Sequence, residues 1–341
     1  MKKPVLMFIG TFSLLTVTFG LSGVCHAGSN QSLPNSALQM DVRLSKETYV
    51  VGEPIVAAIN LKNNGATSVS GVWFSYGSGF YIDIRTAKRK TRVKLNGIET
   101  ERQHLITSWQ TSVAPSASVR TALDIVTGDV LNVDPYFLRA ENQQGEAITG
   151  YIIQPGLYVL VAIQDVKDSS GSLTRLTAEA RFRVRQPDKT ETAALMLMGH
   201  RPIVSNEPLM QPKDAETAAL ATALASFLRV VTSYPHTPYA PYAMYYSGRT
   251  LQTMGKVSQA ARVYQKLLRK YPDFPLQADA LYFLADTSLR AGDLSGANKA
   301  VKSLQTKYSN FLLAPVIRYL EAQTRLQQLE QQASVANVPR R

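Results

Sequence analysis

Cysteine is nearly absent from this sequence of 341 residues, and histidine is scarce. The single cysteine is Cys25, and the four histidines, His26, His104, His200 and His236, are scattered along the chain rather than grouped with other ligands. This inventory predicts no metal site and no cofactor. The sequence also lacks a nucleophile elbow, a zinc-protease helix motif, a phosphate loop and a Rossmann glycine pattern. We therefore expect a protein that is not an enzyme and has no catalytic residues.

Long apolar runs are missing after residue 27. Before that point, Lys2 and Lys3 precede an apolar run over residues 5–24, and small residues follow at 25–27. This three-part order is typical of a cleavable signal peptide, so we expect residues 1–27 to be removed and the protein to be periplasmic. An uncleaved membrane anchor is one alternative. A lipid anchor on Cys25 is another, although Val24 and Ser22 fit that signal poorly.

Acidic residues are the minority among the charges, with 25 Asp and Glu against 37 Lys and Arg and a net charge of +12. A basic exported protein attracts anionic partners such as lipid head groups or peptidoglycan, and nucleic acid is not expected in that compartment. The densest basic run could contact an anion or the envelope, or it could simply be a solvated turn that protects an edge strand. Its residues are Arg85, Lys88, Arg89, Lys90, Arg92 and Lys94.

A period of two dominates residues 38–185. Apolar residues alternate at 40–44, 55–61, 119–125, 157–163 and 180–184, and Asn-Gly, Pro-Gly or Ser-Gly pairs separate several of these runs. In the last run, Arg181, Arg183 and Arg185 fall on the opposite side from Phe182 and Val184. The pattern predicts a β-sandwich domain over residues 38–185.

The first domain resembles bacterial immunoglobulin-like domains. The resemblance rests on LSKETYVVGEPIVAAINLKNNG for a first hairpin and on QPGLYVLVAI and AEARFRV for closing strands. The segment GVWFSYGSGFYIDIR is similar to the aromatic-glycine segment of a Bacillus intracellular proteinase inhibitor family. Its aromatic residues, at 73–81, could form a sugar-stacking or inhibitory loop, but they could equally belong to the sandwich core.

From residue 186 the sequence changes character twice. Residues 186–213 contain four prolines around the short apolar piece 193–198, and we interpret them as an interdomain linker in which that piece could form a docking helix. From Asp214 to about residue 332 the period is that of helices, and residues 333–341 form a C-terminal tail.

The helical part repeats itself every 37 residues. Tyr234, Tyr271 and Tyr308 coincide at this offset, and so do the sets 223/260/297 and 245/282/319. Each unit is predicted to be a pair of antiparallel helices, at 239–254 and 256–271, then at 276–291 and 294–308. Gly255 and Gly292 form the inner turns and Asp293 caps the following helix. One pair cannot bury its own apolar face, so the pairs are expected to stack as an all-α solenoid.

This spacing resembles the tetratricopeptide repeat, or TPR. A small residue at 248 or 285 is followed twelve positions later by Ala260 or Ala297, and then by Tyr264 or Val301. With the Tyr-Pro pair and the signal sequence, the repeats are similar to those of periplasmic TPR proteins such as the outer-membrane assembly lipoprotein and the Tol-Pal coordinating protein. The departures are the 37-residue period and Ser309 in place of proline.

The TPR resemblance implies a groove, lined by the first helix of each pair, that binds a partner's peptide or helix. The alternative is that these tyrosines pack between repeats. The positions implied by the resemblance are Tyr242, Tyr245, Arg249, Asp279, Tyr282, Asp286, Tyr319 and Gln323.

We therefore expect a non-catalytic periplasmic adaptor or scaffold, which binds a protein partner of the cell envelope through its repeats and serves envelope assembly or maintenance. The alternative function is a β-sandwich inhibitor or glycan-binding module that uses the repeats as a tether.

Overall fold

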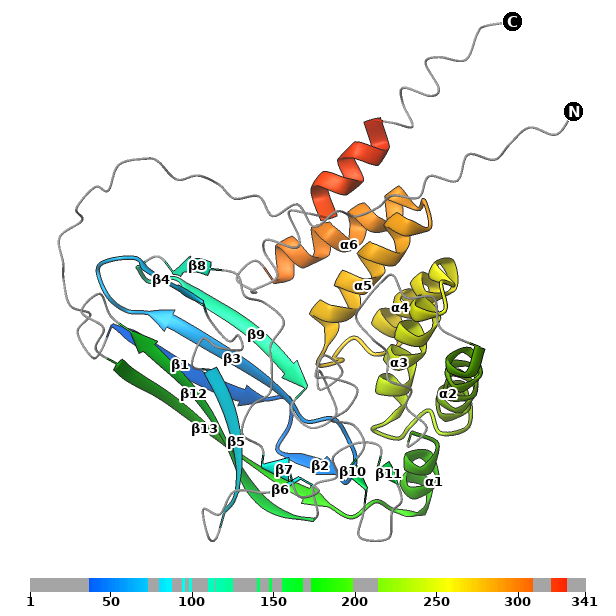
Figure 1. The fold of residues 1–341 in the computed structure, drawn as a ribbon, viewed down its shortest axis with the longest axis horizontal. Coiled ribbons are helices and arrows are strands. Elements are labelled where there is room, and N and C mark those ends of the chain that lie inside the picture. Colours follow the sequence, from blue (N-terminus) through cyan, green and yellow to red (C-terminus); the bar gives the residue numbers. More distant parts are fainter. Residues whose placement is uncertain are drawn as a thin grey trace, which may run out of the picture. The chain divides into compact units, whose positions relative to one another are not determined.

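A computed structural model of the chain confirms the predicted fold class, with β-sheets first and a run of paired helices after them (Figure 1). The structure describes residues 37–72, 80–87, 94–95, 98–99, 110–113, 115–124, 140–141, 147–148, 155–167, 173–198, 214–308 and 320–329.

Two sheets form the framework of the first domain. One is antiparallel, in the order β1-β3-β9, with β1 at Leu38–Leu44, β3 at Val56–Asn63 and β9 at Ser118–Asp124. The other has the order β2-β13-β12-β5. Its members are β2 at Thr48–Val50, β13 at Leu173–Arg185, β12 at Gly156–Lys167 and β5 at Phe80–Thr86. Only β2 in this second sheet pairs in parallel, alongside Arg183–Arg185.

Three short antiparallel pairs accompany these sheets. They are β4 (Val69–Val72) with β8 (Gln110–Val113), β6 (Lys94–Leu95) with β7 (Ile98–Glu99), and β10 (Ala140–Glu141) with β11 (Ala147–Ile148).

Both sheets contribute to one hydrophobic core, as the alternating sequence pattern predicts. Ile59 and Leu61 of β3 lie in the same buried cluster as Leu160 of β12 and Phe182 of β13. Along β13, Phe182 and Val184 are buried whereas the arginines between and beside them are exposed. Two sheets that share a core between their inner faces make a β-sandwich.

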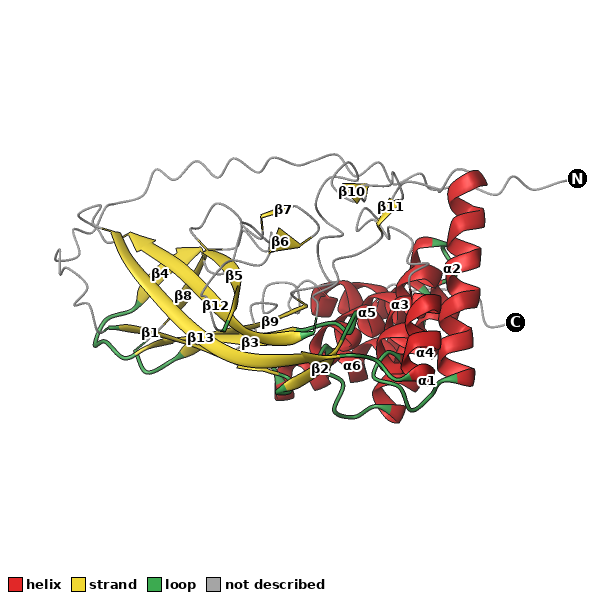
Figure 2. Cartoon of the chain, turned by 90° about the horizontal axis from the view of Figure 1, so that it is seen from below, coloured by secondary structure: helices red, strands yellow, loops and turns green. Residues whose placement is uncertain are grey.

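Among the described residues, six labelled helices follow the sheets, and Figure 2 draws them in red. Their bounds are α1 Lys189–Met198, α2 Asp214–Ser233, α3 Ala240–Thr253, α4 Val257–Lys270, α5 Gln277–Arg290 and α6 Leu294–Lys307. Residues 320–329 are also helical. From α3 to α6 the observed bounds agree with the predicted ones to within one residue at each end. The helical periodicity and the glycine and proline positions are therefore sufficient to locate these helices.

The turns inside the helix pairs are built as predicted. Gly255 and Gly292 have φ of 71° and 78°, a left-handed conformation that favours glycine. The carboxylate of Asp293 accepts a 2.9 Å hydrogen bond from the backbone N–H of Gly296, so it caps α6.

The predicted linker contains a docked helix. Helix α1 packs against α2, and its residues Ala194 and Met198 are buried in the same cluster as Ala223 and Phe227 of α2. The pair α1 and α2 thus precedes the pairs α3/α4 and α5/α6, and α1 takes the place of the first helix of the first unit. Residues 199–213 lie outside the described part of the chain.

Among the described residues, no helix has both the length and the apolar character that crossing a membrane requires.

Candidate functional site

The tyrosines that recur every 37 residues form hydrogen bonds within the helical part of the chain. The hydroxyl of Tyr271 donates a 3.3 Å hydrogen bond to the backbone carbonyl of Pro235, which belongs to the preceding Tyr-Pro copy. In the next unit, the hydroxyl of Tyr308 is 3.0 Å from Oε1 of Gln277. Tyr271 therefore ties the pair α3/α4 to the pair before it, whereas Tyr308 links the end of α6 to the start of α5 within its own pair.

Close packing within a pair explains the small residue of the TPR pattern. A Cβ added at Gly248 in α3 would lie 2.6 Å from the ring carbon Cζ of Tyr264 in α4, which is closer than real side chains approach. Tyr264 is completely buried. In the next pair the corresponding residues are Ala285 and Val301. Alanine is larger than Gly248, and valine is smaller than Tyr264, so the two changes in size offset each other.

We call α3 and α5 the A helices, and α4 and α6 the B helices. The predicted binding residues of the first A helix, α3, are largely enclosed by the chain itself. Tyr242, Tyr245 and Arg249 are 2%, 7% and 9% exposed. The ring of Tyr245 packs edge-on or tilted against Phe274 and Phe283, with centroids 5.7 and 6.2 Å apart. Tyr245 therefore serves packing between repeats, the alternative left open by the sequence.

Helices α3 and α5 are joined by polar groups as well as by aromatic rings. The guanidinium carbon of Arg249 lies 4.0 Å from the ring centroid of Phe283, a cation–π contact. Beside it, Nε2 of Gln252 donates a 3.0 Å hydrogen bond to the carboxylate of Asp286. Sequence analysis missed Gln252 and Phe283, because only the fold shows that they bridge two repeats.

Predicted residues on the second A helix and beyond remain partly accessible. Asp279, Tyr282 and Asp286 of α5 are half-buried, and so is Gln323 in the helical segment 320–329. We call the side of the repeats that carries these four residues the A-helix face. Tyr319 lies outside the described residues.

Burial sets the electrostatics of this face. It raises the pKa of Asp286 above its ordinary value, an effect that the positive charge of Arg290 partly offsets. The guanidinium of Arg290 is 3.7 Å from that carboxylate, one turn along the same helix. The A-helix face thus offers a carboxylate held between an amide and a guanidinium, next to the amphipathic ring of Tyr282.

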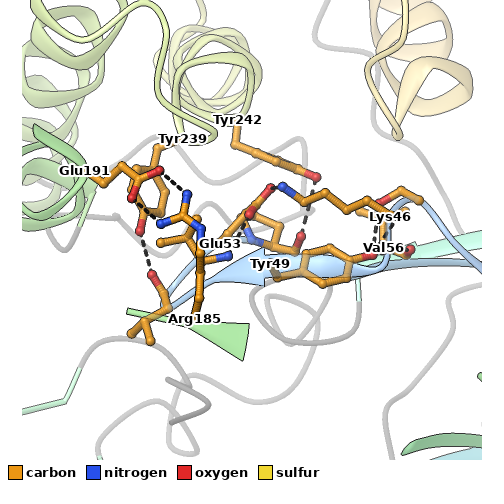
Figure 3. A network of polar contacts seen from close by, with 12 residues as sticks. Lys46, Tyr49, Glu53, Val56, Arg185, Glu191, Tyr239 and Tyr242 are labelled. Carbon is orange, nitrogen blue, oxygen red and sulfur yellow. Dashed lines mark hydrogen bonds and ion pairs between the residues drawn. The ribbon is translucent and has the colours of Figure 1, made fainter. Parts of the chain in front are cut away.

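A second polar centre lies where a sandwich turn contacts the helices (Figure 3). The turn between β2 and β3 includes Val51, Gly52 and Pro54. The hydroxyl of Tyr239, just before α3, donates a 2.6 Å hydrogen bond to the carbonyl of Val51, and the hydroxyl of Tyr242 is 3.5 Å from the carbonyl of Pro54. A Cβ on Gly52 would lie 2.4 Å from Cδ1 of Leu195 in α1. This turn therefore packs against both α1 and α3.

Charged groups hold the turn from the sandwich side (Figure 3). Glu53 is 4% exposed; it pairs with Lys46 and accepts a 3.0 Å hydrogen bond from the backbone N–H of Val50. Burial raises the pKa of Glu53, and the ammonium of Lys46 counteracts that rise. Burial likewise raises the pKa of Tyr49 to about 12, so its hydroxyl stays protonated beside Ser45.

A bidentate ion pair fixes α1 to the last strand. The guanidinium of Arg185 donates bonds of 2.6 and 2.7 Å to the two carboxylate oxygens of Glu191. The same carboxylate accepts from the backbone N–H of Asp188, whose own carboxylate accepts from the N–H of Glu191, so the two residues form a capping box. The hydrogen bonds from Arg185 lower the pKa of Glu191. The same hydrogen bonds restrict the conformation of the predicted linker at its N-terminal end.

The other predicted sites fall mostly outside the described residues. Arg85 in β5 is half-buried and its Nε donates a 2.8 Å hydrogen bond to the carboxylate of Asp83. Lys94 lies in β6. Lys88, Arg89, Lys90 and Arg92, and the aromatic loop at 73–79, are not among the residues described.

In the part of the chain that the structure describes, no group of three or more His, Cys, Asp and Glu side chains could hold a metal ion.

Comparison with protein families gives one match. Residues 242–273, which cover most of α3, all of α4 and the turn after it, match the family described as "Tetratricopeptide repeat". The C-terminal part of this chain contains a tetratricopeptide repeat. A TPR is a protein-interaction module, and this indicates protein partners in general.

Comparison with curated proteins gives no significant match. Among solved structures, a Listeria innocua β-glucosidase in complex with isofagomine matches at 13% identity and a TM-score of 0.23, covering 44% of this chain and 16% of its own. Spo0M, the sporulation control protein of Bacillus subtilis, matches at 12% identity and 0.24, covering 47% and 55%. The ASH / PapD-like domain of human CEP192 matches at 9% and 0.19, covering 49% and 95%. These TM-scores are too low to support a shared fold or function.

Proposed function

We propose that this protein is a non-catalytic periplasmic adaptor, which binds a protein partner of the cell envelope through the A-helix face of its TPR-like repeats. The observation that carries the proposal is the tetratricopeptide repeat at 242–273 followed by a second helix pair with the same turn and packing. The expected signal peptide supports the location, and the resemblance of the repeats to periplasmic TPR proteins supports a role in envelope assembly or maintenance.

The half-buried residues of the A-helix face fit such a role. Tyr282 presents a large ring with a polar tip, and its ring makes an edge-on contact with that of Phe283, with the centroids 5.0 Å apart. Rigid amphipathic rings of this kind are common among interface hot spots. Asp279 and Asp286 flank Tyr282 one turn away on either side, so a partner segment with cationic and apolar side chains would match this face.

The β-sandwich would be a rigid domain that holds the helical repeats in place. Its β2–β3 turn is hydrogen-bonded to Tyr239 at the start of α3, and Arg185 is paired with Glu191 at the start of α1, so both helices are tied to the sandwich. The first domain's resemblance to bacterial immunoglobulin-like domains fits a supporting or docking module of this type.

Affinity capture from envelope extract tests the proposal, with the whole chain as bait. The variant Asp279→Ala/Tyr282→Ala removes two side chains of the A-helix face, and Gln265→Ala/Gln305→Ala is the matched control on exposed positions of the B helices. We expect a specific protein that the wild type and the control retain and that the variant loses at least tenfold. Equal retention by the variant would refute the A-helix face as the binding surface.

A further inference from the structure

The outer sides of α4 and α6 carry only one sign of charge. Neither α4 nor α6 contains a single Asp or Glu. Their exposed cations form what we call the basic B-helix face: Arg262, Lys266, Arg269 and Lys270 of α4, and Lys299, Lys302 and Lys307 of α6.

Helix geometry places these cations on the solvent side of the repeats. The buried residues of α4 are Ala260, Ala261, Tyr264 and Leu267, and those of α6 are Leu294, Ala297, Ala300, Val301 and Leu304. Three repeat positions are buried in both helices, 260/297, 264/301 and 267/304, so a corresponding side of each helix faces solvent. Arg262 and Lys299 occupy equivalent positions at the 37-residue offset, and so do Lys270 and Lys307.

Ion pairs within the described part of the chain do not neutralise this face. None of the salt bridges among the described residues involves a cation of α4 or α6. Two nearby acids have other roles, because Asp293 caps α6 and Glu321 accepts a hydrogen bond from Gln305. The basic B-helix face is therefore a positive field directed into solvent.

The remaining exposed residues of these helices indicate what such a field can bind. In α4 they are Ser258, Gln259 and Gln265, and in α6 they are Ser295, Asn298, Gln305 and Thr306. No exposed apolar or aromatic side chain of α4 or α6 is available as the anchor that a protein interface needs or as a ring to stack on a sugar. Long, flexible cations without such anchors suit a laterally extended array of negative head groups.

We propose that the basic B-helix face docks the protein on a bilayer surface containing anionic phospholipid. The bond is electrostatic, with Lys and Arg side chains reaching lipid phosphates while the helices stay outside the hydrocarbon. The A-helix face of α5 lies on a different side of the repeats and stays available for a protein. This inference does not depend on the function proposed above, because it concerns other residues and another partner.

Vesicle co-sedimentation tests the proposal with the whole chain. The vesicles are phosphatidylcholine with about one third phosphatidylglycerol, compared with pure phosphatidylcholine. The test variant is Arg262→Gln/Lys266→Gln/Arg269→Gln/Lys270→Gln. The matched control, Lys62→Gln/Arg181→Gln/Arg183→Gln/Lys189→Gln, removes the same number of positive charges from exposed positions elsewhere. All variants keep residues 1–27, so any insertion by the apolar run 5–24 is common to them.

We expect the wild type to bind the anionic vesicles, with binding that weakens as salt is raised. The test variant should bind at least about tenfold more weakly and the control within about twofold of the wild type. Equal losses in test variant and control would overturn the assignment to this face. Binding that ignores lipid charge or salt, or binding to a soluble sulfated polysaccharide without binding to vesicles, would overturn the lipid assignment.

Discussion

The hydroxyl of Tyr239 donates a 2.6 Å hydrogen bond to the carbonyl of Val51, a residue 188 positions earlier in the chain. Tyr239 is fully buried and Val51 is 9% exposed, so water cannot easily replace either partner. A hydrogen bond in this setting joins the sandwich to the helix pair α3/α4.

Removing that hydroxyl should weaken the joint. In Tyr239→Phe the carbonyl of Val51 loses its donor, and we expect the free energy of unfolding to fall by about 1–2 kcal/mol. Tyr242→Phe is the control, because the 3.5 Å distance from its hydroxyl to the Pro54 carbonyl indicates a weak bond. Urea unfolding of the three proteins measures both effects. Equal losses of stability in the two variants would show that the contact between the sandwich and α3 does not depend on the Tyr239 hydroxyl.

Two glycines with similar backbone angles should respond differently to alanine. Gly52 and Gly255 both have positive φ, 75° and 71°, but a Cβ at Gly255 meets no atom within 4 Å whereas one at Gly52 meets Leu195. We expect Gly255→Ala to cost about 1 kcal/mol from the backbone alone. Gly52→Ala should cost about 1–3 kcal/mol more, because the added methyl overpacks the contact with α1.

A double-mutant cycle with Leu195→Ala separates the backbone cost of Gly52→Ala from the cost of overpacking against α1. The substitution removes the atoms that the new methyl meets, so Gly52→Ala should cost less in that background, approaching the backbone cost seen at Gly255. Thermal unfolding gives the four stabilities. An undiminished cost in the Leu195→Ala background would show that α1 does not pack on this turn.

The close approach of α3 and α4 makes a third prediction. Alanine normally favours a helix over glycine, yet Gly248→Ala should destabilise the protein by about 1–3 kcal/mol because its Cβ meets the rigid ring of Tyr264. Adding Tyr264→Val recreates the Ala285 and Val301 combination of the next pair.

Tyr264→Val alone leaves a cavity and should itself be costly. The double variant should be more stable than the sum of the two single losses implies, by about 0.5–3 kcal/mol. Strict additivity in chemical unfolding would contradict the contact between these two positions.

The ion pair between Arg185 and Glu191 makes a pH-dependent prediction. Because the folded pKa of Glu191 lies below its ordinary value of 4.5, the pair stabilises the fold fully above that pH and loses its contribution as pH falls through the lowered pKa. Glu191→Gln removes this titration and weakens the capping box of α1. The melting temperature of the wild type should exceed that of Glu191→Gln near neutral pH, and the difference should shrink in acid.

Glu179→Gln is the matched control, since Glu179 is an exposed carboxylate on the same strand as Arg185. Its melting temperature should follow that of the wild type at each pH. A difference between wild type and Glu191→Gln that stays constant from neutral pH into acid would rule out the ionised pair as its cause.

The strands and helices that the sequence predicts correctly are those with a regular local period of apolar residues. The alternation around Phe182 located β13, and the 37-residue repeat located α3 to α6, because both patterns reflect which side of an element is buried. The role of Gly248 also follows from its place in the repeat. These are relationships between residues of one element or of neighbouring helices.

The sequence does not predict contacts between residues that lie far apart in the chain. The resemblance of the stretch around Gly52 to a first hairpin contains no sign that Gly52 lies against Leu195 or that Val51 bonds to Tyr239. For the same reason, the TPR resemblance places Tyr245 on the predicted binding side, although the rings of Phe274 and Phe283 pack against it in the fold. Only the three-dimensional packing distinguishes a ring that meets a partner from one that meets the next repeat.

Site-specific photo-crosslinking in living cells tests the central claim most directly. A photoreactive phenylalanine replaces Tyr282 on the A-helix face in one protein, and Gln265, which is exposed on α4, in a control protein. We predict that illumination joins the first protein to one specific envelope protein, identified by mass spectrometry, and that the control gives no such product. The same product from both positions, or none from position 282, would contradict partner binding by this face of the repeats.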